Sequence, residues 1–352
     1  MPLTDFSNFH YVPILGVRPA EMQALEELPS SDKDGLLPYI ILQPWTTAKQ
    51  LESTIVKLNA VIGSRPIIVD LTEKLFGTSA RRPVHDQFDT LRDSHLGFQN
   101  WYSFVEAHDN YIPALQLTSP EEITSQISRI SSLNRGIVVR LNENIFSFSQ
   151  EIAKLFLGNV PQREIYFILD FQKQGRDILR KVANAVDAAR KIREVLPESF
   201  FSVSASTFPE TFVDIQEQEI FERVFHNLVV TNIGSSNTIY CDRASVRAER
   251  QSGGSGAPAP RIDNALPTKW EFFRVPNVGD RNSAYQRAAQ RAIASPGWND
   301  LGIWGTELIK LTAAGHDGAI ISAKVSTAAR INIHLHIQLG GGAHDMETVW
   351  TD

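Results

Sequence analysis

The sequence predicts an α/β protein built on a (β/α)8 TIM-barrel-like fold with a C-terminal elaboration. Two observations support this prediction. Short apolar runs alternate with helix-like segments through the first two thirds of the 352-residue chain, as in parallel sheets with helical connections. Several of these runs also end in a charged residue, where α/β folds place their chemistry. The four clearest runs are 67–70 (IIVD), 137–140 (IVVR), 167–170 (FILD) and 239–242 (IYCD).

The first part of the chain supplies four strand-like runs and the helices that follow them. Apolar residues at helical spacing, such as Leu51, Ile55, Leu58 and Ile62, mark a helix face. The charged stretch 73–93 is less regular, and we predict a long loop or lid there. The expected strands are 11–15, 37–42, 65–70 and 111–117, and the expected helices are 18–28, 47–62, 98–108 and one that starts at 118–122.

Three further units follow, and an eighth strand completes the set. We expect strands at 136–141, 165–170 and 200–204, with helices at 146–157, 177–196 and 212–225. The eighth strand is either 227–232 or 238–242. Seven or eight such units are what a closed barrel requires. An open doubly wound parallel sheet is the alternative architecture.

The last third breaks the alternation. We divide the chain into a βα-repeat barrel (1–245), a Gly/Pro-rich loop (246–268) and a C-terminal segment (269–352) that packs on or completes the barrel. Within the last segment we expect a strand at 269–274, helices at 284–294 and 307–313, and a final strand at 331–339, where Ile and His alternate.

Composition limits the class of protein. The net charge of −6 argues against a broad nucleic-acid-coating surface but is compatible with a local basic patch. A single cysteine, Cys241, allows no intramolecular disulfide and suggests a reducing compartment. The first residues lack the pattern of a signal peptide, and no apolar run reaches the ~18 residues of a membrane span. We therefore expect a cytoplasmic protein that makes no membrane contact.

Charged residues at four strand ends form the candidate site. Asp70, Asp170 and Asp242 are candidate ligands for Mg²⁺ or Mn²⁺, which prefer oxygen ligands. Arg140, with Asn142 beside it, is a candidate for binding substrate, because a guanidinium group matches phosphate. Such a set suits metal-assisted hydrolysis of a phosphate-containing substrate. The alternative interpretation is a structural network of ion pairs that closes the barrel mouth.

The C-terminal third adds two candidates. Arg274 ends the expected strand 269–274 and could contact the substrate or take part in catalysis. His334 could serve with Asp170 as a catalytic group, because the pKa of histidine lies near neutrality. The competing interpretation is that His334 and His336 form the polar face of a half-buried strand.

Short motifs follow one another along the chain from the segment 11–15 with Glu21, through the turn 242–245 and the segment 270–274, to 328–334. The order of these motifs resembles the T4-type beta protein family of phages and bacteria. Three positions depart from the family pattern. Asp-aromatic-Gly is replaced by Asp-Arg-Ala at 242–244, and Trp-Gly-Asp by Trp-Gly-Thr at 304–306. The paired histidines are reduced to His334, because Leu335 displaces His336. The resemblance implies a phage- or mobile-element-associated protein with a link to phage–host conflict.

Two functions remain open at this point. The first is a metal-assisted hydrolase or phosphodiesterase that acts on a nucleotide or nucleic acid. The second is a barrel scaffold without catalysis whose loops 73–93 and 251–260 bind a phage or host protein.

Overall fold

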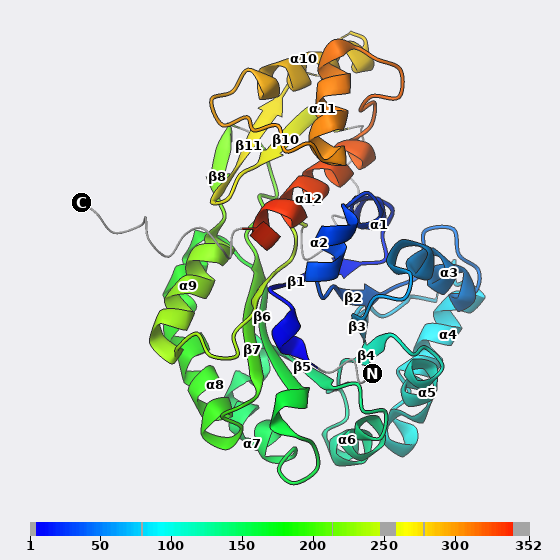
Figure 1. Cartoon of the computed structure of the whole chain (residues 1–352). Helices are drawn as coiled ribbons and strands as arrows, with labels where there is room; N and C mark the ends of the chain where they lie inside the picture. Colours follow the sequence, from blue (N-terminus) through cyan, green and yellow to red (C-terminus); the bar gives the residue numbers. More distant parts are fainter. Residues whose placement is uncertain (1–4, 79, 213, 247–257, 277–278, 341–352) are drawn as a thin grey trace.

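The protein is a mixed α/β structure with parallel strands at its centre and helices outside them, which confirms the predicted α/β class (Figure 1). The computed structural model describes residues 5–78, 80–212, 214–246, 258–276 and 279–340. Elements of the C-terminal third form a smaller lobe that projects from one side of this central body.

Parallel strands of the central body form two sheets, ordered β4-β3-β2-β1-β9 and β5-β6-β7. Isolated parallel bridges from Ala114 to Val138 and from Phe201 to Thr238 connect the edges of the two sheets. All carboxyl ends therefore lie on the same side of the body. The strands are β1 (Tyr11–Gly16), β2 (Tyr39–Leu42), β3 (Ile67–Leu71), β4 (Tyr111–Pro113), β5 (Ile137–Asn142), β6 (Ile165–Lys173), β7 (Phe200–Ser206) and β9 (Tyr240–Asp242).

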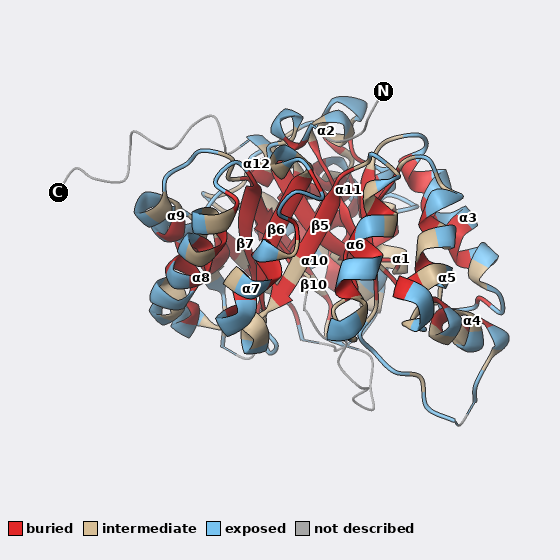
Figure 2. Cartoon of the chain, turned by 90° about the horizontal axis from the view of Figure 1, so that it is seen from below, coloured by how far each residue is buried: buried red, intermediate tan, exposed pale blue. Residues whose placement is uncertain are grey.

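Helices cover the outer faces of these strands and expose their polar sides to solvent (Figure 2). The strands themselves are buried on both faces, which is why they appear in the sequence as continuous apolar runs. These helices are α1 (Pro19–Glu26), α2 (Ser30–Gly35), α3 (Leu51–Ile62), α4 (Pro83–Leu91), α5 (His95–Glu106), α6 (Ile123–Ser131), α7 (Ser149–Lys154), α8 (Val182–Val195) and α9 (Phe221–Ile233).

Two apolar layers result from the alternation of side chains along each strand. Val12 and Ile14 of β1 pack in an inner cluster with Ile68 and Ile168, which come from both sheets. Residues at the alternate positions of the strands, such as Leu15, point outward and pack against the helices. The inner cluster consequently ties the two sheets together.

Phe6 fills the amino-terminal end of the inner cluster. It lies on the short 3-10 helix Phe6–Asn8, is fully buried, and contacts the rings of Tyr166 and Phe200 at centroid distances of 5.3 and 5.6 Å. Gly136 lies against it, since a side chain there would come within 3.0 Å of the Phe6 ring. The start of the described chain thus packs into the core of both sheets.

The smaller lobe combines an antiparallel sheet with two helices of its own. Its strands β8 (Glu217–Glu219), β10 (Arg261–Ala265) and β11 (Lys269–Arg274) follow the order β10-β11-β8. Helix α10 (Arg281–Ile293) packs on β10 and β11, and α11 (Trp304–Ala314) packs against α10. The buried Trp270 belongs to its apolar core.

Helix α12 (Ala323–Gly340) joins the lobe to the central body (Figure 1). Ile333 packs in the core of the lobe, whereas Ile331 and Leu335 pack in the outer core of the central body. One helix is therefore shared by both parts and fixes their relation.

The prediction of a strand at 331–339 is wrong, because this segment belongs to α12. The alternation of Ile and His suggested a strand. Residues 328–335 are buried on every side, however, so the pattern of polar and apolar residues does not reveal the helical periodicity. Of the two candidates for the eighth strand, 238–242 is confirmed in the form of β9, and 227–232 lies in α9.

Three other segments also differ from expectation. The stretch 73–93 contains α4 and is therefore not a continuous loop. The helix expected at 212–225 begins only at Phe221, after the short strand β8. The interval 246–268 includes strand β10, whereas its glycine-rich part at 251–257 lies outside the described residues.

Among the described residues, no helix combines the length and the apolar character needed to cross a membrane.

We predict that Phe6→Ala destabilises the protein by about 3–5 kcal/mol, because it leaves a cavity between Tyr166 and Phe200. Urea unfolding followed by circular dichroism measures this change. Phe148→Ala is the matched control, since this side chain is 58% exposed and its removal should change stability by less than about 0.5 kcal/mol. Equal effects of the two substitutions would contradict the packing described for Phe6.

Candidate functional site

A cluster of charged side chains lies at the carboxyl ends of the parallel strands. Asp70 of β3, Arg140 of β5 and Asp170 of β6 belong to it, and Arg243 joins it from the residue after β9. We call these four residues the strand-end cluster. Three of them were predicted from the sequence, and the structure brings those three together.

Arg140 occupies the centre of the strand-end cluster. Its Nε and Nη2 donate to Asp70 Oδ2 at 3.0 and 2.8 Å, and its Nη1 donates to Asp170 Oδ2 at 3.1 Å. Nη1 also donates to Asn142 Oδ1 at 3.3 Å, and Nη2 pairs with Glu73 Oε1 at 2.8 Å. Every nitrogen of this guanidinium therefore already has an acceptor.

Asp170 holds the second arginine. Its carboxylate is fully buried and accepts a hydrogen bond from Arg243 Nη2 as well as from Arg140. Its other oxygen accepts from the backbone N–H of Gln172 at 3.0 Å. Asp170 thus links two guanidinium groups from opposite sides of the cluster and limits their movement.

Protonation states follow from these contacts. Burial alone would raise the pKa of Asp170, but the guanidinium groups of Arg243 and Arg140 hold this pKa below its usual value. Burial alone would lower the pKa of Arg140, but Tyr39, Asp70 and Asp170 raise it well above its usual value. Asp170 and Arg140 are therefore both charged at neutral pH.

A small cavity of about 20 Å³ lies beside Arg243. Glu21 and Arg18 line it together with Gly16 at the end of β1. A cavity of ~10–15 Å³ is enough for one water molecule. The cavity is therefore large enough for a single oxygen atom, such as that of a water molecule or of an anionic ligand.

Two buried donors without a protein partner occur in this region. Arg243 Nε has no hydrogen-bond partner among the described residues, although the residue is only 7% exposed. Gln43 Nε2 is also without one, and a side chain at Gly16 would come within 2.6 Å of this atom. Buried donors usually have partners, so these two mark a place where a ligand acceptor fits.

Glu21 contributes a titratable group to the same cavity. It lies in the first turn of α1 and accepts from the backbone N–H of Gly16 at 2.5 Å and from Arg18 Nη1 at 3.3 Å. Burial raises the pKa of Glu21 above its usual value. Such a carboxylate is better suited to accept and return a proton near neutral pH than an exposed one.

Asp242 and His334 meet each other on the opposite side of β9. His334 Nε2 lies 2.8 Å from Asp242 Oδ2, and Tyr11 and Tyr240 donate to the same carboxylate. Because side chains alternate along a strand, Asp242 faces α12 whereas Arg243 faces the strand-end cluster. These two predicted residues therefore form a separate buried contact.

Arg274 lies in the lobe, where its Nη1 donates to the backbone oxygen of Phe212 at 3.4 Å. The structure does not bring it to the strand-end cluster. The predicted metal ligands are also divided, since Asp242 faces away from Asp70 and Asp170. Within the described ranges, no group of three or more His, Cys, Asp or Glu side chains is arranged to hold a metal ion.

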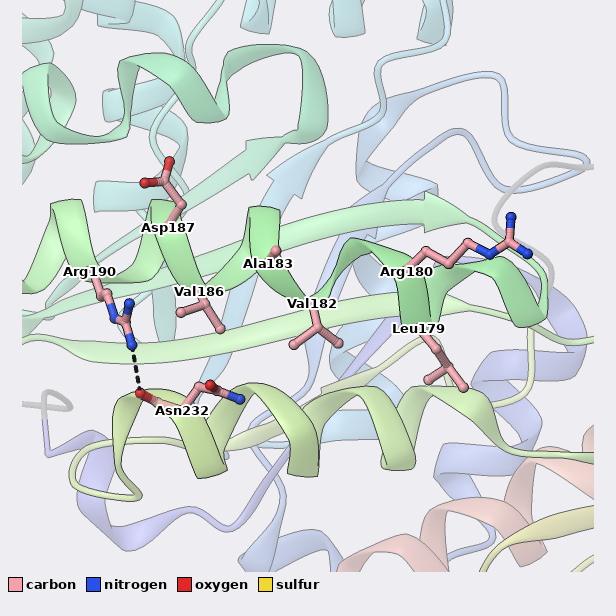
Figure 3. A pocket seen from close by; sticks show the side chains of 8 residues that line it. All are labelled: Leu179, Arg180, Val182, Ala183, Val186, Asp187, Arg190 and Asn232. Atoms are coloured by element: carbon pink, nitrogen blue, oxygen red, sulfur yellow. Dashed lines mark hydrogen bonds between the residues drawn. The ribbon is translucent and has the colours of Figure 1, made fainter.

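A separate groove of about 540 Å³ lies between α8 and α9 (Figure 3). Val182, Ala183 and Val186 form its apolar part, and Arg180 and Arg190 lie toward its two ends. Arg190 Nη2 donates to the backbone oxygen of Asn232 at 3.4 Å. This groove is not lined by residues of the strand-end cluster.

Comparison with known proteins agrees with the motif order described above. The sequence model of the Beta protein family matches residues 11–340. The chain belongs to this family. It is also 28% identical to "Protein beta" of Enterobacteria phage P4 over 346 residues, which cover 95% of this chain and 94% of the phage protein. The predicted family relationship is thus confirmed, and the family match includes the whole strand-end cluster and Glu21.

Glu21 and Arg243 were not singled out as site residues from the sequence. Arg243 directly follows Asp242, the last residue of β9. Because side chains alternate along a strand, the residue after the aspartate could also have been considered as the inward-facing one. Glu21 does not stand at the end of an apolar run, but its place in the first turn of a helix that follows a strand is a usable signal. Cys241 is buried, and this burial raises the pKa of its thiol well above the usual value, which disfavours the reactive thiolate form.

A second buried carboxylate, Glu222 in α9, provides a pH-dependent test of the described electrostatics. Its Oε1 accepts from the backbone N–H of Thr207 at 2.5 Å, and burial raises its pKa from 4.5 to about 7. The folded state therefore binds this proton more tightly than the unfolded state. The resulting stability is present below about pH 4.5 and is lost as the pH rises through about 7.

We predict that Glu222→Gln, which mimics the protonated carboxyl, changes stability little at pH 5 but stabilises the protein at pH 8. The gain should be about 1–3 kcal/mol, from the 1.36 kcal/mol that each pKa unit represents. Urea unfolding at the two pH values measures it. If the free energies of unfolding of the wild type and of Glu222→Gln differ by the same amount at both pH values, the raised pKa of Glu222 is contradicted.

Proposed function

We propose that the protein is a hydrolase of the phosphodiesterase type that acts on a phosphate-containing substrate, either a nucleotide or a nucleic acid. The observation that carries this proposal is the buried Arg243 Nε, which has no partner among the described residues and lies beside the cavity lined by Glu21. We call the cavity and these two side chains the Arg243 pocket.

Arg243 suits the binding of a phosphate oxygen. Its Nη2 is fixed by Asp170, so its Nε is held in place before a ligand arrives. A guanidinium group can donate to phosphate through two parallel hydrogen bonds. Arg140 supports this arrangement indirectly, because it binds the same Asp170 oxygen. In the proposal Arg243 contacts the substrate, whereas Asp170 and Arg140 position it.

Glu21 supplies the acid–base step. A water molecule attacks the phosphorus atom, and Glu21 accepts the proton that this water loses. The bond from phosphorus to the leaving oxygen breaks, and Glu21 returns the proton to that oxygen. Arg243 stabilises the negative charge that develops on the other phosphate oxygens. The raised pKa of Glu21 supports this role, since general acid–base groups work best when their pKa lies near the working pH.

Mg²⁺ or Mn²⁺ belonged to the chemistry predicted from the sequence. Asp70 and Asp170 are the carboxylates of the strand-end cluster, and guanidinium groups already bind both of them. A divalent cation would have to displace these guanidinium groups. This donor set does not fit a metal ion, and we assign no step of the proposed reaction to one.

The proposal also includes a closed (β/α)8 arrangement. The bridges from Ala114 to Val138 and from Phe201 to Thr238 support it, because they connect the two sheets at both edges. Closure would bring all eight strand ends around one mouth, with Asp70 and Arg243 contributed by one sheet and Arg140 and Asp170 by the other. We further propose a cytoplasmic location, which is supported by the single, buried Cys241.

We predict that Glu21→Gln lowers the hydrolysis of bis-p-nitrophenyl phosphate, or of a nucleotide substrate, by about 100-fold or more. Wild-type activity should rise with pH through the raised pKa of Glu21, because only the carboxylate form accepts the proton. Release of nitrophenolate, followed at several pH values, measures both effects.

Glu222→Gln is the matched control, since Glu222 is also a buried carboxylate with a raised pKa but lies outside the Arg243 pocket. This variant should keep wild-type activity at pH values where it remains folded. A Glu21→Gln variant that hydrolyses the substrate at the wild-type rate would overturn the proposed role of Glu21.

A second candidate function is a scaffold without catalysis that binds a phage or host protein in phage–host conflict. It is favoured by the groove between α8 and α9 and by the complete pairing of Arg140, which is typical of a structural network. This function predicts that Val186→Asp abolishes binding of the partner while Glu21→Gln does not. Hydrolysis that depends on Glu21 would favour the enzyme instead.

A further inference from the structure

We propose that an arginine-rich surface of the lobe binds the phosphate backbone of a nucleic-acid strand and presents it to the Arg243 pocket. This inference rests on the proposed function and narrows its substrate to a nucleic acid. The surface, which we call the lobe arginines, consists of Arg261, Arg274, Arg281, Arg287 and Arg291.

The lobe arginines gather where β10 begins and β11 ends. Arg261 and Arg274 are direct partners in the antiparallel pair. Arg291 Nη1 donates to the backbone oxygen of Arg274 at 3.1 Å, so α10 is fixed beside this end of the sheet. Arg287 lies one turn before Arg291 on the same face of α10, and both side chains are exposed.

Carboxylates do not neutralise most of these charges. In the part of the chain that the structure describes, Arg274, Arg281, Arg287 and Arg291 form no ion pair. Asp280 lies nearby, but its carboxylate caps α10 by accepting from Ser283 N and Oγ at 2.7 Å. Positive side chains are thus concentrated at this end of the lobe, although the whole chain has a net charge of −6.

Arginine chemistry favours a nucleic acid over an acidic protein. All five side chains are arginines, whose planar fork matches phosphate oxygens. Arg261 also lies over the ring of half-buried Phe212 at 3.3 Å, so a stacked aromatic and guanidinium surface is present at this end. Arginine and aromatic rings together are typical of surfaces that bind single strands.

A chain of hydrogen bonds connects this surface to the Arg243 pocket. Arg261 Nη2 donates to Asp263 Oδ2 at 2.8 Å, and Arg330 Nη1 donates to the same oxygen at 2.7 Å. Arg330 Nη2 then donates to the backbone oxygen of Ser245 at 3.2 Å, two residues beyond Arg243. The surface and the pocket are therefore held in a fixed relation by buried residues.

The test is the binding of a labelled oligodeoxythymidylate, measured by fluorescence anisotropy over a range of salt concentrations. The double variant Arg287→Gln/Arg291→Gln should bind about 25-fold more weakly at 0.1 M salt, because each phosphate contact to a single strand releases ~0.7 counterion. The slope of log affinity against log salt should fall by about 1.4.

Lys49→Gln/Lys57→Gln is the control, since it removes the same charge from the region of α3, away from the lobe (Figure 1). It should leave both affinity and slope unchanged. Wild-type affinity in the Arg287→Gln/Arg291→Gln variant would overturn the inference, as would equal affinity of the wild-type protein for polyglutamate.

Hydrolysis of bis-p-nitrophenyl phosphate separates this inference from the proposed function. The lobe variant should hydrolyse this small substrate as fast as wild type does, since it does not need the surface. If the lobe variant binds DNA as tightly as wild type does and also hydrolyses the small substrate, the inference is overturned but the proposed function is not. Loss of DNA binding in the lobe variant supports the inference whether or not the wild-type protein hydrolyses the small substrate. A wild-type protein without hydrolytic activity would count against the proposed function.

Discussion

The burial of Asp170 between two guanidinium groups is the constraint on which the site depends. A carboxylate that is removed from water is stable only if it is paired and hydrogen-bonded, and Arg140, Arg243 and the N–H of Gln172 meet this requirement. Removing any one partner would leave a buried charge uncompensated. The strand ends that carry these residues are therefore held together, and Arg243 is fixed through its Nη2 while its Nε has no partner among the described residues.

This constraint also explains how a structural network and a binding site can share residues. Arg140 is completely paired and serves the architecture, whereas Arg243 retains a buried donor beside Glu21. The pocket thus arises where the network is incomplete. Helix α12 extends the arrangement to the lobe, because Arg330 connects Ser245 with Asp263. The proposed substrate surface and the proposed pocket are consequently parts of one continuous set of contacts.

Sequence alone predicted the α/β class, most parallel strands, and the meeting of Asp70, Arg140 and Asp170. It misassigned the side of Asp242 because a strand buried on both faces is apolar at every position, so its sequence carries no information on which residues point inward. His334 and Arg274 were misplaced for a related reason, since a fully buried helix resembled an alternating strand and the lobe has its own sheet. Glu21 was missed because only tertiary folding brings the first turn of α1 to Arg243.

The most direct test of this account is a crystal structure of the protein soaked with tungstate, which mimics phosphate. We expect tungstate at the Arg243 pocket, with one of its oxygens in the cavity about 2.7–3.2 Å from Arg243 Nε, and no tungstate at this position in the Arg243→Met variant. Tungstate that binds elsewhere and leaves the pocket of the wild-type protein empty would contradict the claim that the unpaired donor of Arg243 is a phosphate-binding group.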